Sequence, residues 1–453
     1  MACGLLWMMT GVASAQNGEP VNLAVGDPAR KDRVLSVSTD VLIDTATGAA
    51  LPPAALADRL RDTKLLLLGE SHTSAEFHRV QRQVIEALHR AGRKVTVGLE
   101  MYPYTQQSWL DRWSAGSLDE AAFVDGSNWY EHWGYHWAYY RDIFLFARER
   151  RIPMVAVNAP RDVVSAVRRR GFTNLTPEEA AHIPTDIDVS SADHLTLFKS
   201  YFTEGPGTHG NMSDDALKSM LNAQATWDAT MGFNAVGALK KYPDPQAIVV
   251  VLVGSGHVIY GLGIERQVKR YFDGRVTTLV PVAIDPPASK GPADMMTASA
   301  STPATLPVRA SFANFIWGVP NEPFPRYPEL GLSARPRPAS TQPAPATPAA
   351  GTTSTGASGT SSATSATAAA PTPPPATSAA RPLQVLAVDA DSPAGRAGVM
   401  IGDELVAVDG VPVSGPGNFN RLISEKEWGD VIELRVRRDG AEQTLSVHLQ
   451  RIP

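Results

Sequence analysis

The sequence is poor in cysteine, in excess positive charge and in long apolar runs. Cys3 is the single cysteine among 453 residues, so disulfides and thiolate chemistry are excluded from the rest of the chain. With 41 basic and 46 acidic side chains, the net charge of -5 leaves no basic footprint for nucleic acid. No run after the N-terminus is long enough to cross a bilayer. No Cys-x-x-Cys-His motif for covalent haem occurs.

The N-terminus predicts export. Residues 5–9 form a short apolar core, and residues 13–15 fit an Ala-x-Ala cleavage site, so residues 1–15 are interpreted as a signal peptide. A disordered start is the alternative, because no Lys or Arg precedes the core. Cys3 precedes the core, whereas a lipid-anchored cysteine follows one. We therefore expect a periplasmic protein that is soluble or peripheral to the membrane.

Four apolar runs end abruptly in polar or ionisable residues, over 65–72, 95–100, 152–161 and 248–257. Continuous runs of this kind predict strands buried on both faces, and hence an α/β fold with a mainly parallel sheet covered by helices. Ligands bind beyond the carboxyl ends of such strands. We expect the side chains at these ends to meet at one sheet edge: Glu70, His72, Glu100, Asn158, Arg161 and His257.

The organisation of the chain follows from composition and periodicity. Residues 35–317 are predicted to form the α/β domain, with a helical insertion over about 161–241 whose longest helix spans 214–241. Thr73 and Glu76 predict a capping box for the helix after the first strand. Residues 335–381 are rich in Ala, Pro, Ser and Thr and are expected to be disordered. Residues 382–453 alternate as half-buried strands do, which predicts a small β-rich unit.

The ionisable side chains at the sheet edge allow two interpretations. Glu70, His72, Glu100 and His257 would suit a divalent metal with mixed nitrogen and oxygen ligands. In that case Glu70 or Glu100 is the candidate general base of a hydrolase. The alternative is a hydrogen-bonded network that holds the loops, since no close-spaced motif such as His-Glu-x-x-His is present.

Two further groups are candidates for ligand contacts. Gln224 and Asp228 share one face of the predicted helix over 214–241, so they either reach toward the sheet edge or form an exposed face. Arg161 could hold a carboxylate in a bidentate pair, from a ligand or from Glu70 or Glu100.

Aromatic residues are concentrated between residues 129 and 140, which includes His136, and near predicted strand ends. Such residues could flank a porphyrin, or they could be ordinary helix packing. The tyrosines near strand ends are Tyr102, Tyr104 and Tyr260.

The order of these motifs resembles the ChaN-like haem-binding uptake proteins of the Tiki superfamily. The resemblance rests on residues 68–72 with His78 and Gln81, then 98–101, 158–161, 223–231 and 254–257, and it spans most of residues 40–317. It implies an α/β fold, a role in haem or iron acquisition, and a tyrosine ligand at a homodimer interface. Related branches of the Tiki superfamily imply metal-dependent hydrolysis as an alternative activity. The residues that we assign to cofactor binding on this basis are His72, His78, Asn158, Arg161, Gln224, Asp228, Tyr102 and His136.

The C-terminal unit resembles a bacterial PDZ domain through residues 391–399 and 401–410. This implies binding of a peptide C-terminus, or of an envelope protein, by strand addition to a sheet edge. The carboxylate-binding loop is absent just before Leu383, but Leu330, Gly331 and Leu332 lie in a segment, 328–333, that looks like it. If so, the unit begins near 327 and the low-complexity segment is inserted within it. Otherwise residues 327–328 begin a linker.

Three functions therefore remain open from the sequence. The first is a periplasmic haem- or iron-binding protein with a PDZ unit for partners. The second is a metal-dependent peptidase or esterase. The third is an envelope scaffold that acts through its PDZ unit alone. The resemblance favours the first, whereas the residues themselves indicate a site at the sheet edge.

Overall fold

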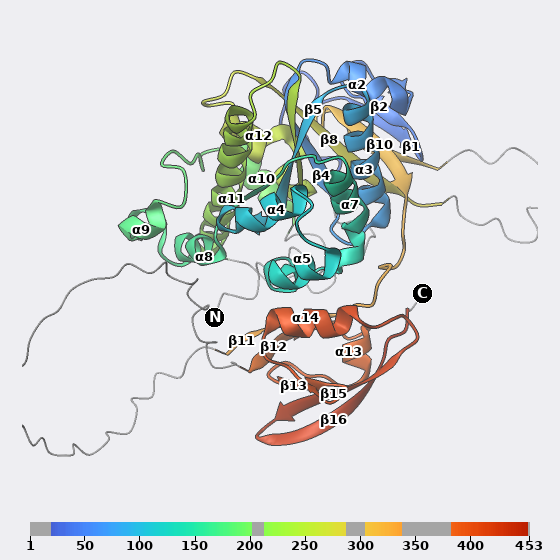
Figure 1. The fold of residues 1–453 in the computed structure, drawn as a ribbon, viewed down its shortest axis with the longest axis vertical. Coiled ribbons are helices and arrows are strands. Elements are labelled where there is room, and N and C mark those ends of the chain that lie inside the picture. The colour runs from blue at the N-terminus through green and yellow to red at the C-terminus, as the bar shows by residue number, and fades with distance from the viewer. Residues whose placement is uncertain (1–19, 202–212, 287–303, 338–381, 452–453) are drawn as a thin grey trace, which may run out of the picture.

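The computed structural model describes residues 20–201, 213–286, 304–337 and 382–451. The expected signal peptide and residues 338–381 of the expected low-complexity segment lie outside these ranges. Figure 1 shows a larger α/β domain and a smaller β-rich domain, with helix α14 on the side of the smaller domain that faces the larger one. None of the helices within these ranges combines the length and the apolar character needed to span a membrane.

The larger domain is built on an eight-stranded sheet with the order β3-β2-β10-β8-β4-β7-β5-β6. The six strands from β10 to β6 are parallel to their neighbours, whereas β2 and β3 pair antiparallel. The prediction of a mainly parallel sheet is confirmed. The strands are β2 (Leu42–Asp44), β3 (Ala49–Leu51), β4 (Thr63–Glu70), β5 (Lys94–Pro103), β6 (Met154–Asn158), β7 (Ala247–Gly254), β8 (Arg275–Ile284) and β10 (Phe315–Pro320).

Helices cover both faces of this sheet, as its continuous apolar strands require. In β4, Leu66 and Leu68 pack in the core under α3 to α7, while Leu65 and Leu67 pack in the core under α11 and α12. The longer helices are α3 (Ala75–Arg90), α4 (Gln107–Ser114), α5 (Glu120–Gly126), α7 (Arg141–Glu149), α8 (Arg161–Arg170), α10 (Ala192–Ser200) and α11 (Asp214–Lys241). The short ones are α2 (Leu56–Arg59), α6 (Trp129–His132), α9 (Pro177–Ala180) and α12 (Ile264–Val268), and η3 (Trp137–Tyr139) is a 3-10 turn.

Helix α3 starts differently from the prediction. Its N-cap is Ser74, whose Oγ accepts a hydrogen bond from the N–H of Phe77 at 3.4 Å. A carboxylate oxygen of Glu322 also accepts from the Ser74 hydroxyl, at 2.8 Å, and from the N–H of Glu76, at 3.1 Å. The predicted capping box of Thr73 and Glu76 is therefore wrong, because Ser74 and a distant carboxylate satisfy the first turn.

The smaller domain is an antiparallel sheet with the order β11-β12-β13-β15-β16, and β14 pairs with β13. Its edge strand β11 comes before residues 338–381 in the chain, and its neighbour β12 comes after them. Two segments far apart in sequence thus form one sheet. The elements are β11 (Leu332–Pro336), β12 (Leu383–Val388), α13 (Pro393–Arg396), β13 (Glu404–Val408), β14 (Val411–Pro412), α14 (Pro416–Ser424), β15 (Val431–Arg438) and β16 (Ala441–His448).

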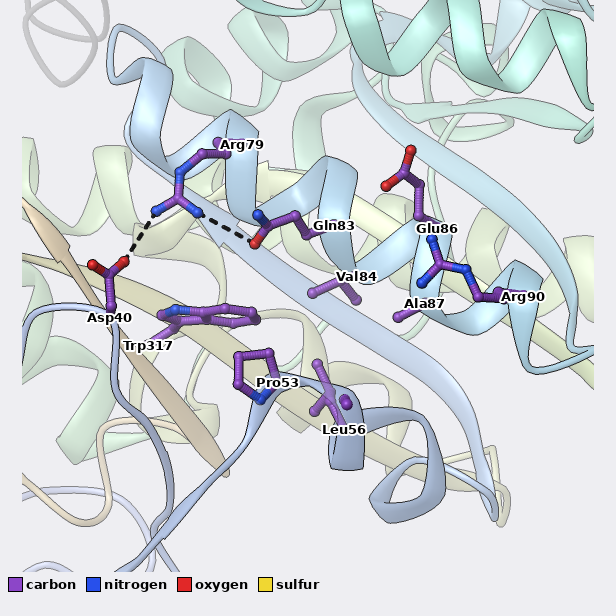
Figure 2. Close-up of a pocket in the computed structure, with 11 residues that line it drawn as sticks. Asp40, Pro53, Leu56, Arg79, Gln83, Val84, Glu86, Ala87, Arg90 and Trp317 are labelled. Atoms are coloured by element: carbon purple, nitrogen blue, oxygen red, sulfur yellow. Dashed lines mark hydrogen bonds and ion pairs between the residues drawn. The ribbon is translucent and has the colours of Figure 1, made fainter.

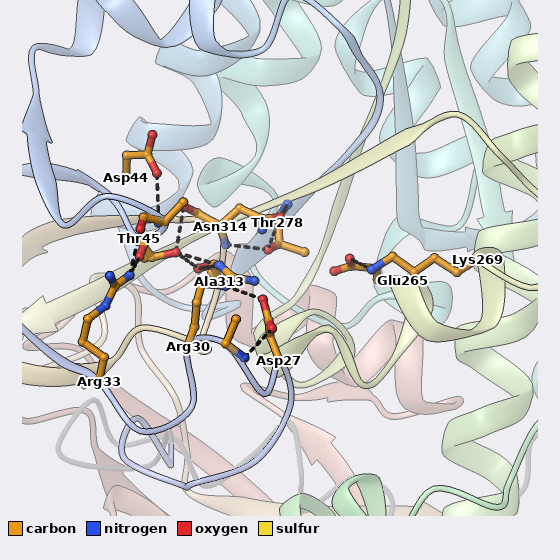
Figure 3. Close-up of polar contacts among 12 residues, drawn as sticks. Asp27, Arg30, Arg33, Asp44, Thr45, Glu265, Lys269, Thr278, Ala313 and Asn314 are labelled. Atoms are coloured by element: carbon orange, nitrogen blue, oxygen red, sulfur yellow. Dashed lines mark hydrogen bonds and ion pairs between the residues drawn. The ribbon is translucent and has the colours of Figure 1, made fainter.

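The N-terminal segment packs against β9 and the residues before β10 in the larger domain. Strand β1 (Val34–Ser38) pairs with β9 (Thr305–Arg309). Before it, Arg30 donates to the Thr45 hydroxyl at 2.8 Å and to the carbonyl of Ala313 at 3.2 Å (Figure 3). The side-chain carbonyl of Asn314 accepts from both the N–H and the hydroxyl of Thr278, at 2.8 and 3.1 Å. The two bonds between Asn314 and Thr278 fix the start of β10 against β8.

Replacement of Asn314 tests this polar junction. Asn314→Ala removes the acceptor of two hydrogen bonds and leaves the donors of Thr278 unsatisfied, so the free energy of unfolding should fall by about 1–3 kcal/mol. Urea denaturation followed by circular dichroism measures the change. The control Asn22→Ala, at an exposed side chain, should stay within about 0.5 kcal/mol of the wild type. Equal stability of both variants would contradict the assignment.

Candidate functional site

Three parallel strands bring distant polar residues to one edge of the sheet. Strand β7 lies between β4 and β5, with Glu70 opposite Gly254 and Leu99 opposite Leu252. The strands therefore end side by side. Glu70 ends β4, Glu100 lies near the end of β5, and His257 follows β7. Glu70, Glu100 and His257 therefore lie at the same edge of the sheet.

Glu70 forms the centre of the first cluster, and its side chain is fully buried. Its carboxylate contacts His72 Nδ1 at 2.8 Å and accepts from Gln81 Nε2 at 2.6 Å and from the Tyr140 hydroxyl at 2.5 Å. His78 Nδ1 lies 3.7 Å away. Burial alone would raise the pKa of Glu70, but the nearby histidines and the hydrogen bonds hold the pKa at about 2. Glu70 is therefore a buried carboxylate that is fully compensated.

His257 forms the centre of the second cluster. Its Nδ1 lies 2.6 Å from a carboxylate oxygen of Asp228, and its Nε2 lies 3.4 Å from Glu100. Gln224 Nε2 lies 2.8 Å from His257 Nδ1. Burial would lower the pKa of His257, but Asp228 and Glu100 raise it to about 10. The second cluster is thus a buried imidazolium between two carboxylates.

The two clusters meet at His72 and Gly254. Glu100 accepts the N–H of Gly254 at 2.7 Å. A Cβ atom on Gly254 would lie 3.0 Å from His72 Cε1, so glycine lets the imidazole lie directly over the strand end. Burial lowers the pKa of His72, but Glu70 and Glu100 outweigh burial and raise it. The His72 side chain keeps 14% of its surface exposed, which leaves one edge accessible to a ligand.

An aromatic rim borders this accessible edge. The ring of His72 lies 4.7 Å from the ring of Trp133, nearly perpendicular to it, and 5.0 Å from the ring of Tyr135. On the side of His257, a Cβ atom on Gly256 would lie 3.3 Å from the Tyr201 hydroxyl. Tyr135 and Tyr201 are half-buried. The rim therefore offers flat apolar surfaces and phenol oxygens beside an imidazole.

Several predicted site residues join these clusters and others do not. His78, Gln224 and Asp228 lie within the clusters, and Asn158 Nδ2 donates to the main-chain carbonyl of Glu100 at 2.8 Å. Of the two carboxylate partners considered for Arg161, the internal pair with Glu70 or Glu100 is not formed. Arg161 donates instead to the carbonyls of Glu131, at 3.1 Å, and His132. It lies at the start of α8 and caps the short helix α6.

Tyr102 and His136 also differ from the prediction. Tyr102 is fully buried in the aromatic core, where its hydroxyl bonds Ser127 at 2.6 Å, so it cannot reach a ligand at the sheet edge. His136 faces the smaller domain, since its Nε2 lies 3.0 Å from the carbonyl of Ser424. Of the other tyrosines considered, Tyr104 bonds His182 at 2.5 Å, and Tyr260 bonds the N–H of Leu23.

Sequence reasoning missed three residues that lie at or beside these clusters. Tyr140 reaches Glu70 from the start of α7, His194 Nε2 lies 3.9 Å from Asp228, and Tyr201 follows α10. All three belong to helical segments without a strand-end pattern. Tyr140 lies within the aromatic stretch already noted, so only the stretch, and not the residue, was identifiable.

The predicted metal group is not formed. Among the residues that the structure describes, no group of three or more His, Cys, Asp or Glu side chains could hold a metal ion. Glu70, His72, Glu100 and His257 do lie together, but their carboxylates already accept hydrogen bonds or face imidazoles within the clusters. A metal would have to displace these contacts.

A separate groove of about 350 Å³ lies on the outer side of α3 (Figure 2). Pro53 and Leu56 line one side, Arg79 and Gln83 line another, and the indole of Trp317 lies between them. It contains none of the side chains of the two clusters.

Comparisons with known proteins assign both domains. Residues 56–268 match the family described as haem-binding uptake, Tiki superfamily, ChaN, and residues 372–449 match the PDZ domain family. The chain carries a ChaN-like domain and a PDZ domain. Both resemblances expected from the sequence are thereby confirmed.

Individual relatives show more distant similarity. The structure of cofacial haem binding to ChaN of Campylobacter jejuni is 17% identical, with a TM-score of 0.44 over 61% of this chain and 95% of that chain. A serine endoprotease from Yersinia pestis is 22% identical over 16% of this chain and 26% of that chain, with a TM-score of 0.15. A protein of Mesorhizobium japonicum named as a zinc metalloprotease is 45% identical over 62 residues, which are 14% of this chain. The chain spans 17% of that relative's length.

The raised pKa of His257 predicts a loss of stability in alkali. Between pH 6.5 and about 10 the folded chain holds a proton that the unfolded chain has lost, so the free energy of unfolding should fall as pH rises. The slope from this one group is at most about 1.4 kcal/mol per pH unit. Urea titrations at several pH values should show a shallower slope for His257→Gln. The variant His89→Gln, at a half-buried position outside the clusters, should keep the wild-type slope, and an unchanged slope in His257→Gln would refute the buried imidazolium.

Proposed function

We propose that the chain is an exported haem-binding protein whose PDZ domain binds peptide C-termini. The main support for haem binding is that the buried site lies within the part of the chain that matches the haem-binding family. The residues of both clusters fall within the span 56–268 that matches the haem-binding uptake family. Export to the periplasm and a role in iron acquisition are part of the same proposal. They rest on the signal-like residues 1–15 and on the family resemblance.

The rim of the site has the chemistry that a haem requires. A haem is bound through apolar contacts with its plane, an axial donor to its iron and partners for its propionates. Trp133 and Tyr135 offer ring surfaces beside the accessible edge of His72. His72, Tyr135 and Tyr201 are the candidate donors. When bound, haem would supply the iron that an uptake system carries.

Arg161 is the candidate partner for a propionate. Its guanidinium uses two nitrogens to donate to the carbonyls of Glu131 and His132 in α6. A guanidinium has five N–H donors, so it retains donors for an anion. The exposed position of Arg161 at the start of α8 also makes it accessible.

The alternative of a metal-dependent hydrolase gains no specific support from the geometry. Its general base was expected to be Glu70 or Glu100, but burial and hydrogen bonds from Gln81 and Tyr140 occupy the Glu70 carboxylate, while Gly254 and His257 face Glu100. An envelope scaffold without a ligand at the sheet edge is the remaining alternative, and the following titration distinguishes it from haem binding.

Haem titration of the full chain tests the proposal. The wild type should develop a Soret band that saturates, and His72→Ala should weaken binding at least about tenfold, or about 1.4 kcal/mol, because the imidazole lies at the accessible edge. Tyr135→Phe and Tyr201→Phe identify the phenol ligand, since loss of the donor to iron shifts the Soret band.

The controls separate haem loss from misfolding. His448→Ala, at an exposed residue of the PDZ domain, should bind haem as the wild type does, and circular dichroism should show that each variant is folded. Metal analysis of the same sample reports any bound divalent ion. A wild-type chain with no saturable Soret band would overturn the haem assignment, and size-exclusion chromatography with and without haem tests the expected homodimer.

A further inference from the structure

The PDZ domain contacts the ChaN-like domain through helix α14. Its first turn lies against α6, where the N–H of Gly417 donates to the Glu131 carboxylate at 2.8 Å and Asn420 Nδ2 donates to the carbonyl of Tyr130 at 3.3 Å. A Cβ atom on Gly417 would lie 2.9 Å from the Cα atom of Glu131, so the two backbones approach as closely as glycine permits. Figure 1 shows α14 between the PDZ sheet and the helices of the larger domain.

His136 of the ChaN-like domain contacts the end of α14 and also Tyr327, in the segment that leads into β11. Its ring stacks on Tyr327, with the ring centres 3.8 Å apart and the planes at 3°. Its Nε2 lies 3.0 Å from the carbonyl of Ser424, the last residue of α14. Its Nδ1 accepts the N–H of Ala138 at 3.1 Å, so Nε2 carries the proton that is donated to Ser424. One imidazole therefore joins the end of α14 to Tyr327.

Tyr327 directly precedes the loop of residues 328–333. The hydroxyl of Tyr139 fixes the same point from the ChaN-like domain, because it accepts the N–H of Arg326 at 3.0 Å. Strand β11 begins within this loop and packs beside α14. The positions of the loop and of α14 relative to each other thus depend on side chains of the other domain.

The loop is suited to a carboxylate. Gly331 has a positive φ of 67°, and a Cβ atom there would lie 2.1 Å from the Cβ atom of Ser392, which requires glycine. Among the described residues, the N–H groups of Leu330 and Gly331 donate no hydrogen bond. Successive N–H groups around a positive φ form a concave site for an anion. This site lies at the start of the edge strand to which a peptide would add.

We propose that the carboxylate-binding end of the PDZ groove is built by both domains, with His136 as the residue that positions it. The inference rests on the proposed peptide binding and adds that affinity depends on a side chain outside the PDZ domain. His136 touches no part of the peptide. It holds the loop, through Tyr327, at a fixed distance from the end of α14, so that a peptide carboxylate and its terminal side chain fit between them.

Peptide titration of the full chain tests this inference. The probes are fluorescein-labelled pentapeptides that end in Val, Leu, Ile, Phe or Ala, each with a free carboxylate and as a C-terminal amide. For the peptide that binds best, His136→Ala and Tyr327→Ala should each raise Kd roughly tenfold, the order expected for one ring stack and one hydrogen bond. Fluorescence anisotropy measures Kd.

Three further results distinguish positioning from a general loss of structure. Tyr327→Phe should bind the peptide with wild-type affinity, because the stack needs the ring and not the hydroxyl. The double variant should bind no more weakly than His136→Ala, since that single variant already removes the stack between His136 and Tyr327. The affinity for the C-terminally amidated peptide should be the same in the alanine variants as in the wild type. His136→Phe, which keeps a ring on Tyr327, should lie between His136→Ala and the wild type, and His89→Ala is the matched control.

The outcomes separate the two levels of the proposal. If no peptide binds the wild-type chain, the proposed function of the PDZ domain is wrong. If the wild type binds a peptide and folded His136→Ala binds it equally well, peptide binding stands and the composite groove is wrong. Equal losses for the free carboxylate and for the amide would also overturn it, because the effect would then lie outside the carboxylate loop.

Discussion

The compensation of buried charge is the constraint on which the sheet edge depends. Carboxylates and imidazoliums without water are costly unless each has a partner. Glu70 and Asp228 are fully buried, and Glu100 nearly so, yet each has a histidine within contact distance. These pairs form only if β4, β7 and β5 keep their parallel register, because a shift by one residue would turn the side chains to the other face. The ion pairs of the site therefore depend on the register of the same strands that form the fold.

This arrangement also decides what kind of ligand the edge can accept. The carboxylates are used internally, while His72 and His257 keep 14% and 11% of their side-chain surface exposed. The imidazole edge of His72 lies beside the rings of Trp133 and Tyr135. A flat, largely apolar molecule with an electron-accepting centre suits that surface better than a bare cation does.

Strand periodicity in the sequence was enough to predict the parallel strands and the residues at their ends. It was not enough to predict which side chains the helices bring to the site. The four apolar runs became β4, β5, β6 and β7, and the helix expected over 214–241 is α11. Their register brought Glu70, Glu100 and His257 together. The directions of Arg161, Tyr102 and His136 were not predictable, because each is set by tertiary packing between segments whose distance no local pattern encodes. Tyr140 and His194 were missed for the same reason.

The boundary between the domains shows why low complexity alone is a poor guide to domain limits. Residues 338–381 resemble a linker in composition, yet β11 precedes them and pairs with β12, which follows them. Removal of everything before residue 382 would strip the PDZ sheet of its edge strand and of Leu330 and Gly331, where a peptide carboxylate is expected to bind. It would also remove Tyr327, whose ring is held by His136. The sheet of the PDZ domain therefore includes a strand from before residues 338–381, and a fragment that began at residue 382 would lack that strand.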